Sequence, residues 1–154
     1  MGNLECHQQR SESMVNSEAD LRQLLQTRKD AHCHLSFVES HLTSSGIPDI
    51  AYTIDGITGW LELKYGTPAR APHLRLSQRQ WFKDNVSAGG MPLLLLASRR
   101  GNSVAYGLIR GELYAEMYQA KTLKKWELLC GHLTTNFDLI LVLLTTPALI
   151  PIRR

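Results

Sequence analysis

A tight turn between two β-forming runs is the feature that most limits how this chain can fold. Residues 47–54 and 57–65 are rich in β-branched and aromatic side chains, and the dipeptide Asp55-Gly56 separates them. Asp-Gly between such runs is a strong signal for a hairpin with a two-residue loop. Such a loop fixes the pairing register, because Ile54 then faces Ile57 and every further pair follows in step.

The predicted register brings two acidic side chains together. Asp49 lies opposite Glu62 at a non-hydrogen-bonded pair, where Cα atoms are about 4.5 Å apart. Facing carboxylates repel unless a cation lies between them, and Mg²⁺ prefers such oxygen ligands. Lys64 follows on the same strand face, about 7 Å beyond Glu62. Glu-x-Lys alone is usually a solvated ion pair, but this combination indicates a metal site beside which a phosphate can bind.

Period-two alternation divides the hairpin into two faces. The apolar face, which we expect in the core, carries Ile50, Tyr52, Ile54, Ile57, Leu61, Leu63 and Tyr65. The mixed face carries Asp49, Ala51, Thr53, Thr58, Trp60, Glu62 and Lys64. A slip of one residue would move a carboxylate onto the core face, so the site depends on the turn.

The residues Pro48-Asp49 followed by Glu62-Leu63-Lys64 resemble the motif of the PD-(D/E)xK nuclease superfamily. Within that superfamily the chain resembles small phage-type VRR-NUC nucleases and Holliday junction resolvases. The likeness runs from Glu18 to about Arg110, and residues 76–81 followed by 88–90 look like the helix after the motif in VRR-NUC proteins. The resemblance implies an α/β fold with a restriction-endonuclease-like αβββαβ core, in which helices flank a central mixed sheet. It also implies Mg²⁺ or Mn²⁺ held by Asp49, Glu62 and the backbone carbonyl of Leu63.

On this resemblance we expect a metal-dependent DNA endonuclease that hydrolyses phosphodiester bonds. Its substrates would be junctions, flaps or other branched DNA in replication, recombination or repair. Lys64 would orient the attacking water or stabilise developing negative charge. The alternative is a non-catalytic DNA-binding or assembly protein with a retained nuclease fold. Such copies generally lose an acid or the lysine, whereas Asp49, Glu62 and Lys64 are all present.

Glu18 has a structural and a functional interpretation. It opens a helix predicted from Ser17 to about Lys29, where a carboxylate interacts favourably with the helix dipole. Ser17 and Asp20 fit a capping box at this helix start. Glu18 also shares the stripe of the buried leucines and would be a further metal ligand if that stripe faces the hairpin. The sequence leaves both roles open.

Gln80 also has two interpretations. A second helix is predicted to begin at Ser77 and to end at Gly89-Gly90, which places Gln80 at the capping-box position. The resemblance instead implies a catalytic glutamine after the motif, which would orient water or phosphate near the metal. One side chain can hardly do both, and the sequence does not decide between them.

Hydrophobic periodicity predicts the remaining elements. We expect strands at residues 32–39, 91–98 and 103–110, the second of them buried on both faces. Residues 111–129 are predicted to be mostly helical, whereas 137–144 fit a helix or a strand. Residues 1–16 are polar and predict a flexible N-terminal tail, which leaves one nuclease domain at 17–154.

Positive side chains cluster after the hairpin, although the formal net charge is only +3. Such a cluster suits a phosphate backbone and binds it without reading sequence. Backbone amides and hydroxyls of the segment before Pro48 could contact the same phosphates. The predicted DNA-binding residues are Ser44, Ser45, Arg70, His73, Arg75, Arg79 and Lys83.

Cysteine usage and hydropathy bear on compartment and partners. Three cysteines without a CxxC pair favour a reducing compartment. Zinc is disfavoured because His32 and Cys33 would point to opposite faces of a strand. The apolar run 139–144 is too short to span a bilayer. We therefore predict an intracellular, cytoplasmic protein that binds DNA and no membrane, whose apolar C-terminal residues either complete the core or form a homodimer face.

Overall fold

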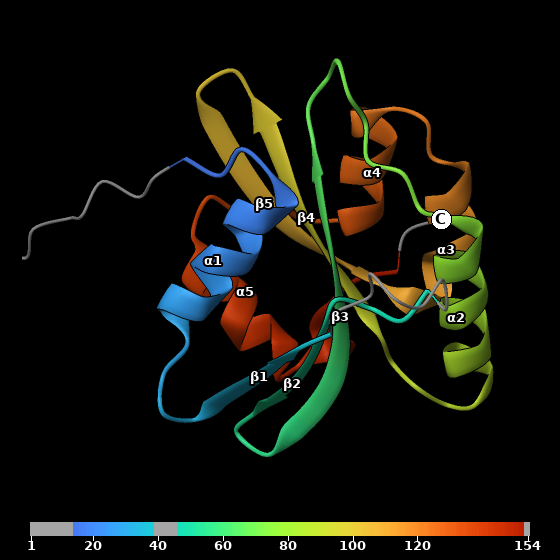
Figure 1. Cartoon of the computed structure of the whole chain (residues 1–154). Helices are drawn as coiled ribbons and strands as arrows, with labels where there is room; N and C mark the ends of the chain where they lie inside the picture. Colours follow the sequence, from blue (N-terminus) through green and yellow to red (C-terminus); the bar gives the residue numbers. More distant parts are fainter. Residues whose placement is uncertain (1–13, 39–45, 153–154) are drawn as a thin grey trace, which may run out of the picture.

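A computed structural model describes residues 14–38 and 46–152. Within them the chain forms a five-stranded mixed sheet in the order β1-β2-β3-β4-β5, with helices on both faces (Figure 1). Helices α1 (Glu18–Arg28) and α5 (Phe137–Leu144) cover one face. The other face is covered by α2 (Leu76–Ser87), α3 (Tyr114–Gln119) and α4 (Leu123–Cys130). The predicted α/β class, with a mixed sheet flanked by helices, is confirmed.

The sheet is antiparallel except at its centre. Its strands are β1 (Cys33–Phe37), β2 (Ile50–Ile54), β3 (Ile57–Gly66), β4 (Leu93–Arg100) and β5 (Ser103–Arg110). Only the β3–β4 pair in this sheet is parallel, and α2 forms the crossover between these two strands. Short 3₁₀ turns, η2 (Gly111–Leu113) and η3 (Pro147–Leu149), follow β5 and α5.

The hairpin of β2 and β3 has the predicted register. Ile54 pairs with Ile57, and Ile50 pairs with Leu61. Asp55 and Gly56 both have positive φ angles, 49° and 79°, as a tight hairpin turn requires. On the expected core face Ile50, Tyr52, Ile54, Leu61 and Leu63 are buried. Ile57, beside the turn, is 43% exposed and does not belong to the core.

Two hydrophobic cores lie on opposite faces of the sheet. The first includes Leu25 of α1 and Ile140 of α5. The second includes Phe82 of α2 and Trp126 of α4. In strand β4, Leu93 and Leu95 lie in the first core, and Leu94 and Leu96 lie in the second. This confirms the predicted strand that is buried on both faces.

After β5 the chain is mainly helical, and the segment 111–129 has one break that the sequence did not predict. Residues 111–129 are mostly helical as expected, but Ala120 is extended and separates α3 from α4. Thr122 then caps α4, because its side chain accepts from the amide of Lys125 at 3.2 Å. The ambiguous segment 137–144 is the helix α5, and its buried residues recur at helical spacing.

Helix α1 begins where predicted, but packing begins earlier. Oγ of Ser17 accepts from the amide of Asp20 at 3.1 Å, and the Asp20 carboxylate accepts from the amide of Asn16 at 2.8 Å. In a capping box the side chain at the third helical position accepts from the amide of the cap residue, which here would be Ser17. In this helix the Asp20 side chain accepts instead from the amide of the preceding residue, Asn16. Val15 is 3% exposed in the first core, so chain packing begins before the predicted domain boundary at residue 17. Residues 1–13 of the predicted tail lie outside the described residues.

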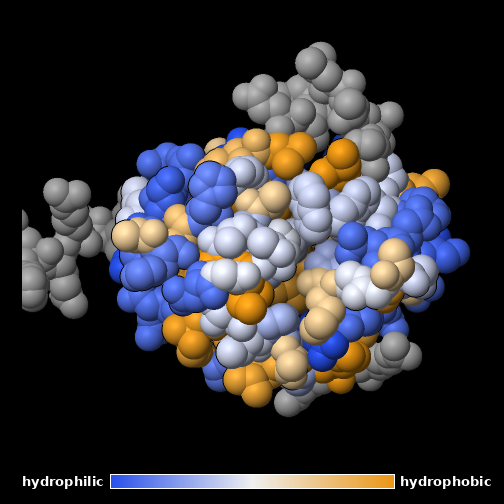
Figure 2. Space-filling view, turned by 90° about the horizontal axis from the view of Figure 1, so that it is seen from below, coloured by the Kyte–Doolittle hydropathy of each residue, from blue (hydrophilic) through white to orange (hydrophobic). Residues whose placement is uncertain are grey.

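The surface combines polar and apolar side chains. Figure 2 shows hydrophobic residues in several groups among hydrophilic ones on the face seen from below. Among the described residues, the most exposed large apolar side chains are those of Leu76, Leu128, Val142 and Leu149. None of the helices in residues 14–38 and 46–152 combines the length and apolar character needed to cross a membrane.

Candidate active site

The mixed face of the hairpin carries a cluster of buried polar residues. Glu62 and Lys64 of β3 are 2% and 6% exposed, and Gln78 of α2 is 3% exposed. The parallel pairing aligns the two charged residues with Leu94 and Leu96 of β4. Charged side chains are rarely buried in this way unless they are paired. The three residues form one connected cluster between β3 and α2.

Gln78 connects the first turn of α2 to an ion pair on β3. Nζ of Lys64 lies 3.1 Å from Oε1 of Glu62 and donates to Oε1 of Gln78 at 3.3 Å. Nε2 of Gln78 donates to the same oxygen of Glu62. Oε1 of Gln78 also accepts from the amide of Arg75 at 3.0 Å. The side chain of Gln78 therefore caps the helix and holds the ion pair at once.

Asp49 lies immediately before β2, and its carboxylate reaches β3. Oδ2 of Asp49 accepts from the amide of Leu63 at 2.8 Å. One further step in the β2–β3 register, beyond the pair of Ile50 and Leu61, sets Asp49 opposite Glu62. The turn and the register thus bring Asp49, Glu62 and Lys64 to one part of the sheet.

The electrostatics of the cluster centre on Glu62. Burial raises the pKa of Glu62 to about 7, while the positive charge of Lys64 opposes this shift and the negative charges of Asp49 and Glu18 add to it. Oε2 of Glu62 is buried and has no hydrogen-bond partner among the described residues. An unsatisfied buried oxygen is unfavourable. A cation at this oxygen would satisfy it and favour the ionised carboxylate.

The donor set fits a hard divalent cation in chemical character. Asp49 and Glu62 supply carboxylates, whereas Leu63 reaches the site only through its backbone, because its side chain lies in the first core. Mg²⁺ often takes only one or two protein carboxylates and completes its shell with water and phosphate. Across the described ranges, no three His, Cys, Asp or Glu side chains are grouped so that they could hold an ion. The two carboxylates of Asp49 and Glu62, a backbone oxygen and water would therefore form the main part of such a site.

Glu18 lies at the rim of this cluster. Its side chain is exposed, but desolvation of the carboxyl group is the largest influence and raises the pKa of Glu18. The charge of Lys64 and a backbone hydrogen bond from Tyr65 lower this pKa, and the charge of Asp49 raises it. Glu18 thus stands in the first turn of α1 and also within electrostatic reach of Asp49. Both of its predicted roles stay open.

Gln80 does not join the cluster. It is exposed, and its Nε2 donates to Oδ1 of Asp84 at 2.8 Å. The predicted start of the second helix at Ser77 is wrong, because the N-cap is Arg75 and Gln78 takes the third helical position. Sequence reasoning missed Gln78 because Ser77 and Gln80 imitate a capping box. Gln78 precedes the buried Phe82 by four residues, and this helical spacing was the signal that could have placed Gln78 on the buried face of α2.

The segment that leads to Asp49 packs closely against α2. Gly46 has a φ of 71°, a backbone conformation that favours glycine. A Cβ at this position would lie 2.1 Å from the backbone oxygen of Ser77. Gly46 therefore allows the chain to pass the first turn of α2, beside Gln78, on its way to Asp49.

The predicted DNA-binding residues are only partly grouped. Arg70, His73, Arg75 and Lys83 are exposed in the loop before α2 and along this helix. Arg79 instead places its guanidinium 5.0 Å from the ring centroid of Tyr118 on α3. Nε of Arg79 is buried without a hydrogen-bond partner in the described part of the chain. Ser44 and Ser45 lie outside the described residues.

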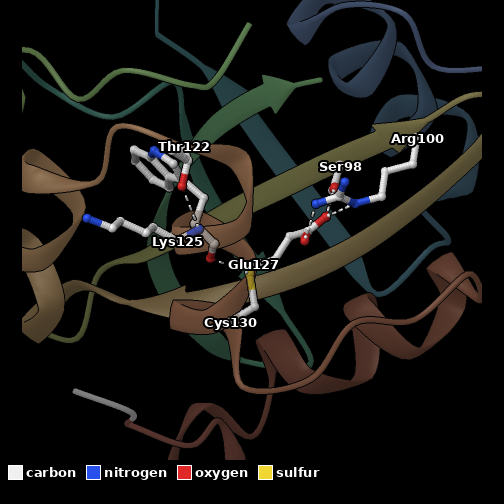
Figure 3. A network of polar contacts seen from close by, with 7 residues as sticks. Ser98, Arg100, Thr122, Lys125, Glu127 and Cys130 are labelled. Atoms are coloured by element: carbon white, nitrogen blue, oxygen red, sulfur yellow. Dashed lines mark hydrogen bonds and ion pairs between the residues drawn. The ribbon is translucent and has the colours of Figure 1, made fainter. Parts of the chain in front are cut away.

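A second polar network lies farther along β4 (Figure 3). Glu127 of α4 accepts from Oγ of Ser98 at 2.5 Å and from Nε and Nη2 of Arg100 at 2.9 and 2.8 Å. The hydrogen bond from Arg100 is the main influence that lowers the pKa of Glu127. This network fastens α4 to the end of β4, and it shares no residue with the candidate site.

Comparison of the chain with protein-family models, with curated proteins and with solved structures finds no match in any of the three. A function for this chain must therefore be argued from its own residues. The cluster of Asp49, Glu62, Lys64 and Gln78 is the candidate functional site.

Proposed function

We propose that this chain is a metal-dependent deoxyribonuclease that hydrolyses phosphodiester bonds. The observation that carries the proposal is the buried pair of Glu62 and Lys64 with Asp49 beside it and one Glu62 oxygen without a partner among the described residues. The succession α1-β1-β2-β3-α2-β4 supports a restriction-endonuclease-like core, because it is the order that the sequence motif implies.

Asp49 and Glu62, with the backbone carbonyl of Leu63, would hold Mg²⁺ or Mn²⁺ in this proposal. When bound, such an ion polarises a phosphoryl oxygen and lowers the pKa of a coordinated water. Lys64 adds a fixed positive charge 3.1 Å from Glu62, where it can stabilise negative charge that develops on the phosphate. Its low exposure keeps this charge out of bulk water, where it would be screened.

Gln78 is a positioning residue in the same proposal. It bonds to both members of the ion pair and is fixed in turn by the amide of Arg75. Groups that orient the ligands of a metal commonly change activity or metal affinity by about 10- to 100-fold when removed. Gln78 therefore takes the place that the sequence interpretation gave to Gln80.

The exposed cations before and within α2 suit a DNA backbone. Arg75 is adjacent to the cluster through its hydrogen bond to Gln78, and Arg70 and His73 precede it in the same loop. Phosphate contacts of this kind fix the register of a nucleic acid without reading its sequence. We therefore propose selectivity for DNA structure, such as a junction or flap, over selectivity for sequence.

One observation favours a second candidate, a DNA-binding or assembly protein that keeps the fold and does not cleave. Glu62 and Lys64 are almost fully buried and bonded to each other. A buried ion pair can be retained for its structural role, because removal of one partner leaves an unpaired buried charge. In this second candidate the cluster holds α2 on the sheet and has no chemical function.

A cleavage panel separates the two candidates. Purified full-length chain is incubated with four-way junction, flap, nicked duplex and single-stranded DNA in Mg²⁺, in Mn²⁺ and in EDTA. The nuclease proposal expects metal-dependent cleavage that is lost in Glu62→Gln and Lys64→Ala and retained in Glu127→Gln, purified in parallel. Equal cleavage by the site variants would contradict it. DNA binding without cleavage under every condition would establish the second candidate.

A further inference from the structure

In the described part of the chain, the sheet face that carries Glu62 is partly accessible towards the β2–β3 turn. Ala51 and Thr53 of β2 are half-buried, and Thr58 of β3 is exposed. Alternation along β3 sets Thr58 and Trp60 on the same face as Glu62, and Trp60 pairs with Ala51. The buried cluster therefore borders directly on accessible sheet surface.

Two tryptophans stand at this border. Trp60 of β3 and Trp81 of α2 meet edge to face, with ring centroids 5.5 Å apart and an interplanar angle of 66°. Trp81 is half-buried and packs on the second core, where it contacts the ring of Phe82. Trp60 is also half-buried, but within the described residues it is not part of either core and does not pack against one. An accessible tryptophan without a core role is a candidate for recognition.

The tryptophan pair, Trp60 and Trp81, is built on the two elements that form the candidate active site. Trp60 precedes Glu62 by two residues on the same strand face, about 7 Å away along the strand. Trp81 follows Gln78 by three residues, which is about one helical turn. Because Gln78 contacts Glu62 while Trp81 contacts Trp60, the pair lies next to the site along both elements.

We propose that this tryptophan pair is a stacking surface for an unpaired base of the DNA strand whose phosphate lies at Glu62 and Lys64. This inference rests on the proposed nuclease function and names its substrate class. A base in a continuous duplex offers no free face, whereas an unpaired base can stack on an aromatic ring regardless of its identity. The substrate would be DNA with an unpaired nucleotide beside the scissile phosphate, as in a flap, a fork or an open junction.

A binding cycle tests the stacking surface without requiring cleavage. The full-length chain is titrated in EDTA with a hairpin duplex that carries a single-stranded thymidine overhang, and with the same DNA in which the overhang is abasic. Both titrations are repeated for Trp60→Leu, which keeps an apolar side chain without a ring, and for Trp60→Phe, which keeps a ring. Leu128→Ala, at an exposed apolar position on α4, is the matched control. Circular dichroism and thermal unfolding confirm that each variant is folded.

Stacking predicts coupling between the ring and the base. Removal of the bases should weaken wild-type binding about tenfold, within the range typical of one stacked base. Trp60→Leu should weaken binding to the intact overhang by a similar factor. The affinity of this variant should then be the same for the intact and the abasic overhang. Trp60→Phe should recover most of the affinity, and Leu128→Ala should behave as wild type. Intrinsic tryptophan fluorescence gives a second readout, and stacking of a base should quench it. Trp126, the third tryptophan of the chain, is fully buried, so the quenching should come from Trp60 and Trp81.

The possible outcomes separate this inference from the nuclease proposal. If the chain binds DNA but the effects of Trp60→Leu and of base removal on affinity are independent, or if binding does not quench the fluorescence, the stacking surface is overturned. The nuclease proposal then still stands. Coupling in EDTA without cleavage in Mg²⁺ or Mn²⁺ supports the stacking surface and overturns the catalytic proposal. Absence of binding to every DNA overturns both.

Discussion

The side-chain amide of Gln78 donates a hydrogen bond to Oε1 of Glu62, although the two residues are 16 positions apart in the sequence. The same amide group accepts from Lys64 and from the backbone of Arg75. One uncharged side chain therefore orients a buried carboxylate, a buried ammonium and the first turn of α2. Because the second Glu62 oxygen stays without a partner in the described residues, the arrangement holds that oxygen available for a ligand.

Replacement of Gln78 should reduce activity more than it reduces folding. We expect Gln78→Ala to slow DNA cleavage about 10- to 100-fold, because Glu62 and Lys64 lose the group that orients them. Gln80→Ala is the matched control and should change the rate less than about twofold, since Gln80 contacts Asp84 at the surface. Single-turnover cleavage as a function of Mg²⁺ concentration measures both variants. Equal losses in the two would contradict the assignment of Gln78.

Asp49 should have separable structural and chemical roles. Asp49→Ala removes the acceptor for the amide of Leu63, and we expect it to lower the free energy of unfolding by about 1 kcal/mol. Asp49→Asn can still present an oxygen to that amide and should unfold close to wild type. Cleavage should be lost in both variants, because the proposed ion site then keeps only one of its two carboxylates. Urea denaturation and the cleavage assay decide, and an active Asp49→Asn would remove Asp49 from the proposed site.

The backbone conformation of the hairpin turn should affect the stability of the fold without any side-chain contact. Gly56 has a φ of 79°, and a Cβ there would meet nothing within 4 Å. We expect Gly56→Ala to lower the free energy of unfolding by about 1 kcal/mol, because an L-residue is strained in this conformation. Asp55→Asn should be neutral, since asparagine suits the same turn. Chemical denaturation gives both values, and an unchanged Gly56→Ala would argue against this turn geometry.

The network around Glu127 should make stability depend on pH in a defined direction. Arg100 lowers the pKa of Glu127 in the folded state below its ordinary value of 4.5. The contribution of this ionised carboxylate is therefore present above pH 4.5 and is lost as the pH falls through the lowered folded pKa. We expect Glu127→Gln to cost about 1 kcal/mol at pH 7, with a difference from wild type that shrinks in acid.

A matched control for this pH dependence is the exposed pair of Arg28 and Asp138. Their side chains are 32% and 65% exposed, and the charged atoms are 3.4 Å apart. Asp138→Asn should change the free energy of unfolding by no more than about 0.5 kcal/mol, because solvent screens such a pair. Thermal or urea unfolding from pH 3 to pH 8 compares the two variants. A Glu127→Gln difference that grows towards low pH would show that the sign is wrong.

The local parts of the fold were predictable because they depend on neighbouring residues. Asp55-Gly56 determined the turn and the register of β2 and β3. Ser17 determined the start of α1, since a cap acts within one helical turn. The start of α2 was wrong for a related reason. Gln78 and Gln80 fit the capping position of two alternative helix starts, Arg75 and Ser77, and the buried Gln78 is the one that caps α2.

The sequence by itself determined the hairpin and hence that Asp49, Glu62 and Lys64 share one face, because a two-residue loop fixes register and alternation fixes direction. Tertiary structure decided what meets that face. The crossover helix between β3 and β4 brought Gln78 onto Glu62 and Trp81 onto Trp60, through contacts between residues that are 16 and 21 positions apart. Such contacts follow from how α2 packs on the sheet. Spacing along the chain can place Gln78 on the buried face of α2 with Phe82, but it does not say which strand residues that face meets.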